Sequence, residues 1–220
     1  MFRKLTIGLA LLGGYCLNAY GGNQQYEPLS ASVSTVLSRS VADTSSPRLS
    51  FEDEMDGAVW LADMSTRLRR HIADEEERRE FLITVHYEAT RAGLDPQLVL
   101  ALIQVESGFR KYAISTAGAR GYMQVMPFWL EVIGDGADHN LFDLRTNLRY
   151  GCVILRHYLD IEKGNLFRAL GRYNGSLGKA RYPNLVHRTW KRYWTYTYDK
   201  PGVTRVSGRE AGKPSGRTRF

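Results

Sequence analysis

The chain has 220 residues, of which 43% are hydrophobic and 24% charged, and this balance excludes a wholly disordered protein. Its two cysteines, at positions 16 and 152, exclude a disulfide-rich scaffold and a zinc site built from three or four thiolates. The formal net charge of +7 invites a nucleic-acid interpretation, but the cations are spread over both ends and the centre of the chain, so nucleic-acid binding is not predicted.

Residues 1–22 have the pattern of a secretory signal peptide. Two cations at positions 3 and 4 precede the apolar run Leu5–Leu12, which is too short to span a bilayer comfortably. We therefore predict export to the periplasm or cell envelope; the alternative for this run is a buried N-terminal helix or strand. Cys16 lies where a lipoprotein would be cleaved, but Tyr15 directly before it is unfavourable. Peripheral or lipid-anchored membrane association therefore stays open.

Two segments are predicted to lack regular structure. Residues 23–54 form a serine-rich linker, expected to be mobile because few large apolar residues occur in its second half. Residues 199–220 form a tail with six basic and two acidic residues, rich in glycine, arginine and serine, and expected to be disordered.

Between these segments the apolar residues recur at helical spacing, which predicts an all-α, or at least α-dominated, fold. Residues 55–79 are predicted to form an N-terminal helical extension and residues 80–198 the main domain. One helix should begin near Asp74, because three glutamates follow it and anions stabilise a helix N-terminus. That helix should end near Gly93.

Further helix boundaries follow from local residue preferences. Asp95 suits an N-cap and Pro96 the first position of the next helix. Residues 144–159 and 166–173 are predicted to be helical as well. The alternation of Thr and Tyr at Tyr193–Tyr198 supplies the one strand signal in this part of the chain.

The helix after Asp95 carries a carboxyl group in register with its apolar face. Val99, Ile103 and Glu106 share one face by the three-and-four spacing, although Glu106 comes near the helix end. Apolar surroundings and the helix C-terminus would both raise the pKa of such a carboxyl, as a general acid requires. The alternative is that Glu106 reaches water and simply ends the helix; spacing alone favours neither.

Three blocks of sequence then resemble the lysozyme-like soluble lytic transglycosylase (SLT) domain, family 1 of the lytic murein transglycosylases. They are Glu106-Ser107 with Phe109, the stretch Ala113–Pro127, and Arg172-Tyr173-Asn174-Gly175. The resemblance covers about residues 80–190, with the blocks in the family's order. The chain departs from the family pattern at Tyr122, where Leu is usual, and in the last block, where the glycine follows the asparagine directly.

The resemblance implies a helical, lysozyme-like fold with a substrate groove and an enzyme that acts on peptidoglycan glycan strands. Such enzymes cleave the β-1,4 bond between MurNAc and GlcNAc without water and leave 1,6-anhydroMurNAc ends. It further implies that Glu106 is the catalytic acid and then the base, and that Tyr173 orients it. The substrate-binding residues would be Ser107, Met123, Gln124, Tyr173 and Asn174. For each of these five, an ordinary packing or capping role is the alternative.

A scheme with one acid agrees with the residues themselves. Ordinary glycosidases place two carboxylates at the bond, yet residues 107–130 contain no Asp or Glu. Second acids from elsewhere stay open as alternatives, and the candidates are Glu131, Asp135, Asp138 and Asp143. Aromatic residues could stack on sugars, although most should belong to the core; these are Phe128, Trp129, Tyr182, Trp190 and Trp194.

Other classes of function are disfavoured. The five histidines show no metal-ligand spacing, so no metal and no cofactor is predicted. Two alternative functions remain: a lysozyme-like muramidase, in which water attacks instead of the sugar hydroxyl, and a non-catalytic protein that binds the cell wall. The oligomeric state is not predicted.

Overall fold

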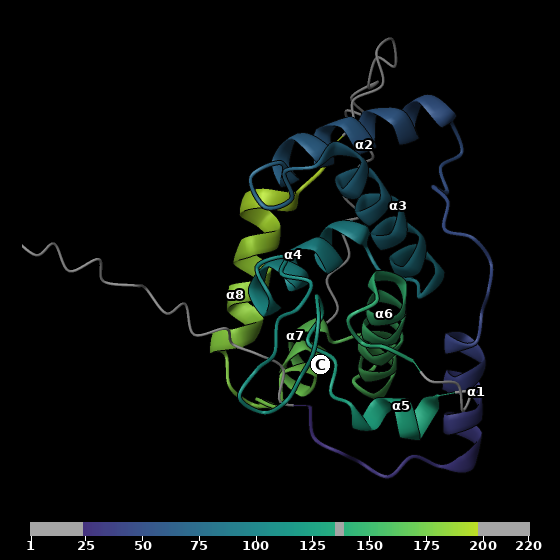
Figure 1. The fold of residues 1–220 in the computed structure, drawn as a ribbon. Helices are drawn as coiled ribbons and strands as arrows, with labels where there is room; N and C mark the ends of the chain where they lie inside the picture. The colour runs from purple at the N-terminus through teal and green to yellow at the C-terminus, as the bar shows by residue number, and fades with distance from the viewer. Residues whose placement is uncertain (1–23, 135–138, 198–220) are drawn as a thin grey trace, which may run out of the picture.

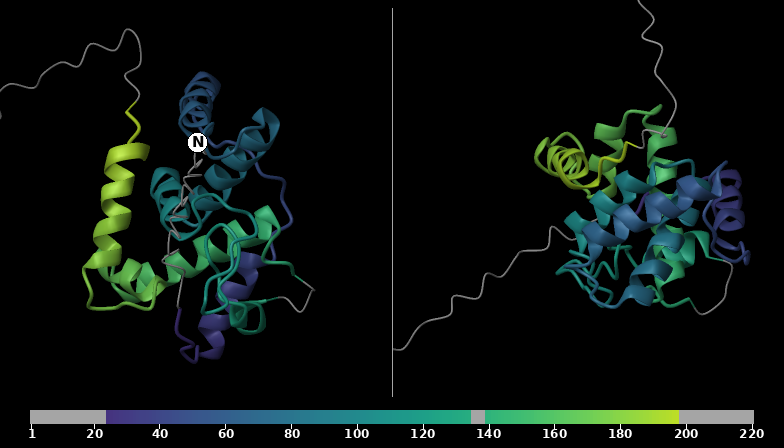
Figure 2. Two further views of the ribbon diagram at one scale, coloured as in Figure 1. Left: turned by 60° about the vertical axis from the view of Figure 1, so that its left-hand side comes forward. Right: turned by 90° about the horizontal axis from the view of Figure 1, so that it is seen from above.

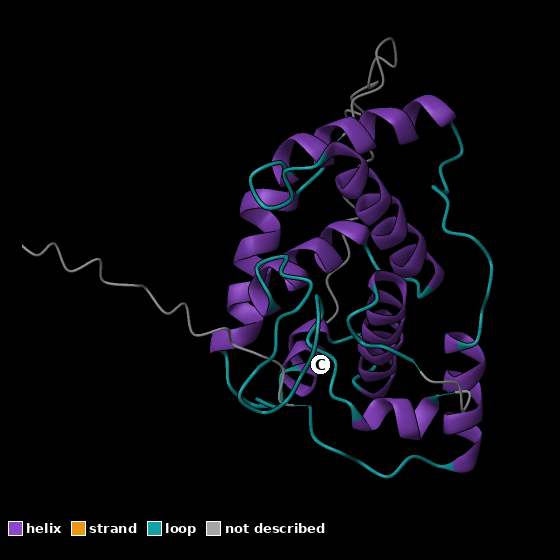
Figure 3. Ribbon diagram, viewed as in Figure 1, coloured by secondary structure: helices purple, strands orange, loops and turns teal. Residues whose placement is uncertain are grey.

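The computed structural model describes residues 24–134 and 139–197, and this part of the chain is a cluster of helices joined by loops (Figures 1 and 3). The helices are α1 (Ala31–Val41), α2 (Glu54–Leu68), α3 (Glu75–Arg91), α4 (Pro96–Glu106), α5 (Phe128–Ile133), α6 (Leu144–Ile161), α7 (Leu166–Tyr173), α8 (Arg181–Thr189) and a π-helical turn, η1 (Trp190–Trp194). The described residues form no strand, only two isolated antiparallel bridges between residues 114 and 125. The all-α prediction is confirmed.

Helix α4 lies at the centre of the fold and contacts α3, α8 and η1. Residues 98–103 are all buried, as expected of a helix that is apolar on nearly every side. The predicted start is confirmed, because the Asp95 side chain accepts from the backbone N–H groups of Gln97 and Leu98, and Pro96 is the first helical residue. Glu106 is the last residue of the helix.

The other predicted helix positions agree with the structure. Asp74 caps α3 and accepts from the Glu77 N–H at 2.8 Å. Helices α6 and α7 begin and end within two residues of the predicted limits. Helix α6 packs between α3 and α7, and it carries Asn147, whose side chain binds the loop after α4. No helix in the described part of the chain has both the length and the apolarity needed to span a bilayer.

The prediction of an irregular linker at residues 23–54 is wrong for residues 31–41. Residues 31–41 form α1, which packs on α5 and α6 and buries Leu37 and Val41 (Figure 1). These two residues are four apart on one helical face, while most of the serines face water or cap the helix. The high serine content concealed this amphipathic pattern.

A buried ion cluster fixes the end of α1 to the domain. Glu88 on α3 is 1% exposed and binds the guanidinium of Arg149 on α6 at 3.0 Å. Arg149 also donates to the carbonyls of Val41 and Asp43, at the end of α1 and beyond it. Arg91 pairs with both Glu88 and Asp43. Because a buried carboxylate needs such partners, this cluster joins the N-terminal segment to the core.

The strand signal at Tyr193–Tyr198 is also corrected. Tyr193 and Trp194 belong to η1, and the Trp194 indole N–H donates to the Gln104 Oε1 at 2.7 Å. Burial of this large ring against α4 decides the local structure over the alternation of Thr and Tyr. The predicted signal peptide, Cys16 and the whole of the predicted tail lie outside the described residues. Cys152 is buried in α6, and its burial raises the pKa of its thiol well above the usual value.

Candidate active site

Glu106 is fully buried at the C-terminal end of α4, with an exposed fraction of 0%. The chain reverses direction immediately after it, because Gly108 and Phe109 both adopt the left-handed conformation, at φ of 59° and 65°. The Phe109 ring then packs against His71, Phe81 and Trp194. The carboxyl group is therefore held on a helix end whose position is fixed by the packing of the turn that follows.

The phenol of Tyr182, near the start of α8, donates a hydrogen bond to Oε1 of Glu106. Tyr182 is buried, and its pKa is raised well above 10 by burial, by the charge of Glu106 and by this hydrogen bond. The phenol therefore keeps its proton and acts as a permanent donor to the carboxyl group. The sequence placed Tyr182 only among candidate stacking aromatics, because its partner lies 76 residues away.

Tyr173, expected to orient Glu106, donates to the backbone carbonyl of Met123 at 2.8 Å. It is the last residue of α7 and is fully buried. Burial and the nearby charge of Glu106 raise its pKa well above 10. Tyr182 thus donates to the acid, while Tyr173 fixes the loop that carries Met123; the orienting role of Tyr173 stays a prediction.

The loop of residues 113–126 is folded tightly beside the acid. Arg120 and Val125 exchange backbone hydrogen bonds at 2.9 and 3.0 Å, and Gly121 between them has a φ of 76°. Gln124 is fully buried, also at a positive φ, and its amide nitrogen donates to the carbonyls of Ala113 and Gly121. Its Oε1 is buried and has no hydrogen-bond partner among the described residues. A buried acceptor of this kind can bind a ligand N–H.

Asn147 on α6 organises this loop, although sequence reasoning did not identify it. Its Oδ1 accepts from the Met123 N–H at 2.7 Å, and its Nδ2 donates to the carbonyls of Arg120 and Leu141 at 2.8 Å. These three hydrogen bonds satisfy the polar atoms of the Asn147 amide, which is fully buried and cannot reach water. The sequence contains one sign of this role: Asn147 is a polar residue next to Leu148, among the residues of α6 that face the core.

Gln24, in the segment predicted to be a linker, also binds the loop. Its side chain is 3% exposed; the amide nitrogen donates to the Gln124 carbonyl at 3.1 Å, and the amide oxygen accepts from the Met126 N–H at 3.0 Å. Nearby, Glu27 pairs with Arg172 on α7 at 3.1 Å. The segment before α1 is therefore attached to the same side of the domain as the loop.

The remaining predicted residues have more ordinary contacts. The Ser107 hydroxyl donates to the Ile103 carbonyl at 3.1 Å, which caps α4. Asn174 follows α7 as its C-cap and is partly exposed. The structure therefore brings Met123, Gln124 and Tyr173 together around the loop beside Glu106, and it leaves Ser107 with a capping role.

No second acid joins this arrangement in the described part of the chain. Glu88 is the other buried carboxylate there, and it is neutralised by arginines in the α3–α6 cluster. Glu131 and Asp143 are exposed, and Asp143 caps α6; Asp135 and Asp138 lie outside the described residues. No group of three or more His, Cys, Asp or Glu side chains in the described ranges is arranged to hold a metal ion.

Comparison with known proteins gives a family match over the part of the chain that contains this site. Residues 84–192 match the family described as Transglycosylase SLT domain. Membrane-bound lytic murein transglycosylase C of Haemophilus influenzae is 45% identical over 119 residues, which cover 47% of this chain and 33% of that protein. The protein of the same name from Actinobacillus pleuropneumoniae is 45% identical over 53 residues, which cover 24% of this chain and 14% of that protein.

Two further similarities come from a phage and from a solved structure. The transglycosylase of Enterobacteria phage PRD1 is 32% identical over 99 residues, covering 45% of this chain and 36% of the phage protein. An inactive mutant of lytic transglycosylase Slt from Pseudomonas aeruginosa is 25% identical, with a TM-score of 0.40, and covers 50% of this chain and 21% of that one. The match to this chain thus covers only about a third, or less, of the length of these curated relatives.

Proposed function

Residues 84–192 of this chain form a transglycosylase SLT domain, and on that premise we propose that the protein is a peptidoglycan lytic transglycosylase. Its substrate is the glycan strand of the wall, cut at the β-1,4 bond between MurNAc and GlcNAc. The reaction uses no water, and it leaves a 1,6-anhydroMurNAc end on one fragment and a free GlcNAc end on the other.

One observation carries the proposal: a buried carboxyl group, Glu106, is held by a permanent donor, Tyr182, beside the loop of residues 113–126. A single acid of this kind supports a reaction in which one group first gives a proton and later takes one. The described residues supply no second carboxylate beside it, so a nucleophilic carboxylate mechanism lacks its second member.

The proposed steps conserve atoms and charge. The Glu106 carboxyl group protonates the glycosidic oxygen as the bond to C1 of MurNAc breaks, and the 2-acetamido oxygen of that sugar stabilises C1. The Glu106 carboxylate then accepts the proton of the 6-hydroxyl as this oxygen forms the new bond to C1. Tyr182 keeps the carboxyl group in one orientation through both steps, because its hydroxyl remains a donor throughout.

Gln124 supports binding of an N-acetylated sugar. Its Oε1 is buried, accepts no hydrogen bond from the described residues, and belongs to the loop beside Glu106. The amide N–H of an acetamido group is a suitable donor for such an acceptor. Met123 beside it and Asn174, which is partly exposed, are proposed to line the sugar groove.

The proposal includes export. Positions 1–22 have the composition of a signal peptide, and a wall-degrading enzyme acts in the cell envelope. We propose association with the envelope, by a lipid anchor or by surface contacts.

The test is mass spectrometry of the products that the purified full chain releases from purified sacculi. We expect muropeptides that end in 1,6-anhydroMurNAc. Reducing MurNAc ends would instead assign a lysozyme-like hydrolase on the same site, and the absence of any released muropeptide would assign a binding protein. Either of these outcomes overturns the proposal.

A further inference from the structure

A hollow lined mostly by arginines lies where the end of α2 meets η1. It has a volume of about 500 Å³ and is lined by Thr66, Arg67, Arg69, Arg70, Arg192 and Tyr193; we call it the arginine hollow. Figure 1 shows α2 and the end of the α8–η1 rod meeting at this corner of the molecule. None of these residues belongs to the site around Glu106.

Three of the four arginines have no carboxylate partner among the described residues. Arg67 is neutralised by Asp63 at 2.6 Å and also donates to the carbonyls of Tyr193 and Thr195, so it fixes the wall of the hollow. Arg70 and Arg192 lie against the ring of Tyr193, with guanidinium carbons 5.7 and 5.3 Å from its centroid. Arg69, Arg70 and Arg192 are exposed. The hollow therefore concentrates positive charge that no carboxylate of residues 24–134 and 139–197 compensates.

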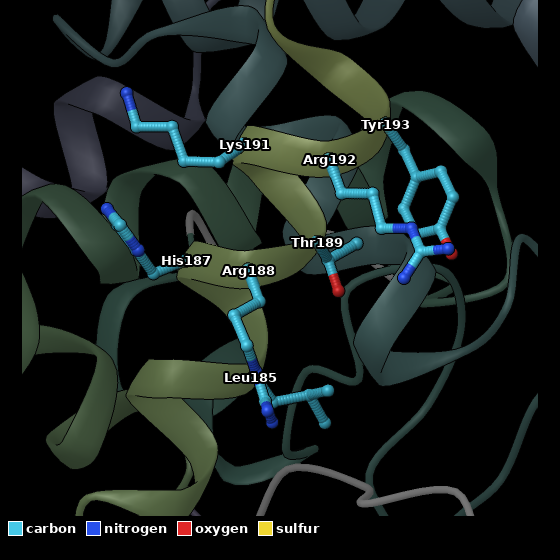
Figure 4. Close-up of a pocket in the computed structure, with 7 residues that line it drawn as sticks. All are labelled: Leu185, His187, Arg188, Thr189, Lys191, Arg192 and Tyr193. Carbon is cyan, nitrogen blue, oxygen red and sulfur yellow. The ribbon is translucent and has the colours of Figure 1, made fainter.

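A second hollow continues from the first along α8. It has a volume of about 590 Å³, shares Arg192 and Tyr193 with the arginine hollow, and adds Leu185 and Arg188. Figure 4 shows Arg188 and Arg192 on successive parts of the same helical rod, with the Arg192 side chain beside the Tyr193 ring. The cations thus form a row along the rod rather than a single point.

This row lies on the same helical rod as Tyr182, the donor to the acid. Tyr182, which donates to Glu106, lies six residues before Arg188 and ten before Arg192 on the continuous α8–η1 rod. At 1.5 Å per residue these separations are about 9 and 15 Å along the axis. The left view of Figure 2 shows this rod running along one side of the domain. The arginines and the donor to Glu106 therefore belong to one continuous helical element.

We propose that the arginine hollow and its continuation bind the carboxylates of acidic peptide substituents on the glycan strand, outside the bond that is cut. Guanidinium groups bind carboxylates bidentately, and arginines held on an aromatic ring lose less conformational freedom on binding. Both hollows are shallow and open to solvent, so a peptide attached to a glycan strand that lies across them can reach the guanidinium groups. The inference rests on the proposed function, because it assigns to the same substrate a second point of contact.

The test compares soluble glycan strands that carry their stem peptides with the same strands after an amidase has removed the peptides. Binding is measured with the full chain carrying Glu106→Gln, so that the strands are not cut. At low salt we expect the peptide-bearing strands to bind about tenfold more tightly. The difference should shrink as salt rises, because exposed charges are screened.

The decisive variant is Arg70→Gln with Arg192→Gln in that background. It should reduce binding of peptide-bearing strands to the level of stripped strands. The matched control is Arg39→Gln with Arg48→Gln, which removes the same charge from two exposed arginines, one in α1 and one after it. This control variant should keep the tenfold preference for peptide-bearing strands. Thermal unfolding verifies that all variants fold, and a destabilised double variant is replaced by the single Arg192→Gln.

Failure of this inference is distinguishable from failure of the proposed function. If the unmodified protein releases anhydro-ended products but the arginine variants bind both strands as before, the hollow does not bind the peptides. If the variants instead lose binding to phosphatidylglycerol vesicles or to inorganic phosphate alone, the ligand is a phosphate group and the inference is overturned. If neither strand is cut or bound, the proposed function fails and this inference fails with it.

Discussion

The hydroxyl of Tyr182 on α8 donates to the carboxyl group of Glu106 on α4, and both side chains are buried. A second buried tyrosine, Tyr173, lies in the electrostatic field of the same carboxyl group but donates to the Met123 carbonyl. Two tyrosines of similar burial therefore have different partners. One is bound to the acid itself and the other to the loop beside it.

Removing each hydroxyl should separate these roles. Tyr182→Phe deletes the donor to Glu106, so we expect kcat on peptidoglycan to fall about tenfold or more with little change in KM, since a hydrogen bond to a charged group contributes about 1.5–3 kcal/mol. Tyr173→Phe should lower the free energy of unfolding by about 1 kcal/mol and affect KM more than kcat. Identical effects of the two substitutions on kcat would contradict this assignment.

Glu106→Gln should abolish turnover, with a loss of at least about a hundredfold, because an amide cannot give or take the proton. Tyr182 can still donate to the amide oxygen, so the unfolding midpoint should stay close to that of the unmodified protein. Product release from sacculi measures turnover, and thermal unfolding monitored by circular dichroism measures stability. Glu131→Gln is the matched control, because Glu131 is exposed. Activity retained in the Glu106 variant would place the acid elsewhere.

Gly151→Ala should disturb the Met123 position. A Cβ at Gly151, in the interior of α6, would lie 2.4 Å from the Met123 Sδ. We expect a loss of about 1–3 kcal/mol in the free energy of unfolding, as for other overpacked cores, together with lower activity. Gly57→Ala in α2 is the control, since the nearest atom to its Cβ would be in the Phe51 ring, at 3.1 Å, with Leu49 at 3.6 Å. A Gly151 variant as stable as the Gly57 variant would show that Met123 can move freely.

Acidification should destabilise the protein through His86. Its ring stacks on Phe51 with centroids 4.5 Å apart, and burial lowers its pKa from 6.5 to about 4. Above pH 6.5 the residue is neutral in both states. As the pH falls from about 6.5 toward 4 the unfolded chain takes up a proton that the folded protein does not, so stability is lost, by about 1–2 kcal/mol at pH 5.

Urea unfolding at pH 7 and pH 5 measures this loss. His86→Phe should make the free energy of unfolding less dependent on pH. The pKa values of the buried His157 and of the more exposed His71 are also lowered by desolvation, and these two residues should supply the slope that remains. His187→Gln is the control, because His187 is exposed, and it should keep the original slope. An unchanged slope in the His86 variant would contradict the prediction.

Much of the fold could be predicted because its signals are local. The N-cap at Asp95, the proline after it and the apolar run of α4 lie within a dozen residues, and each acts on the backbone directly. The same holds for Asp74 at the start of α3 and for the limits of α7. Helix α1 was missed because two apolar residues four apart, Leu37 and Val41, are too few to outweigh a serine-rich composition.

The sequence by itself determined the helical character of the domain, the place of Glu106 at the end of an apolar helix, and the resemblance of its three blocks to one family. Only the tertiary structure decided which tyrosine binds the acid and that Asn147 and Gln24 hold the loop of residues 113–126. The physical reason is distance along the chain. Residue preferences and periodicity act over a few helical turns, whereas Tyr182 meets Glu106 across 76 positions because α8 packs on α4.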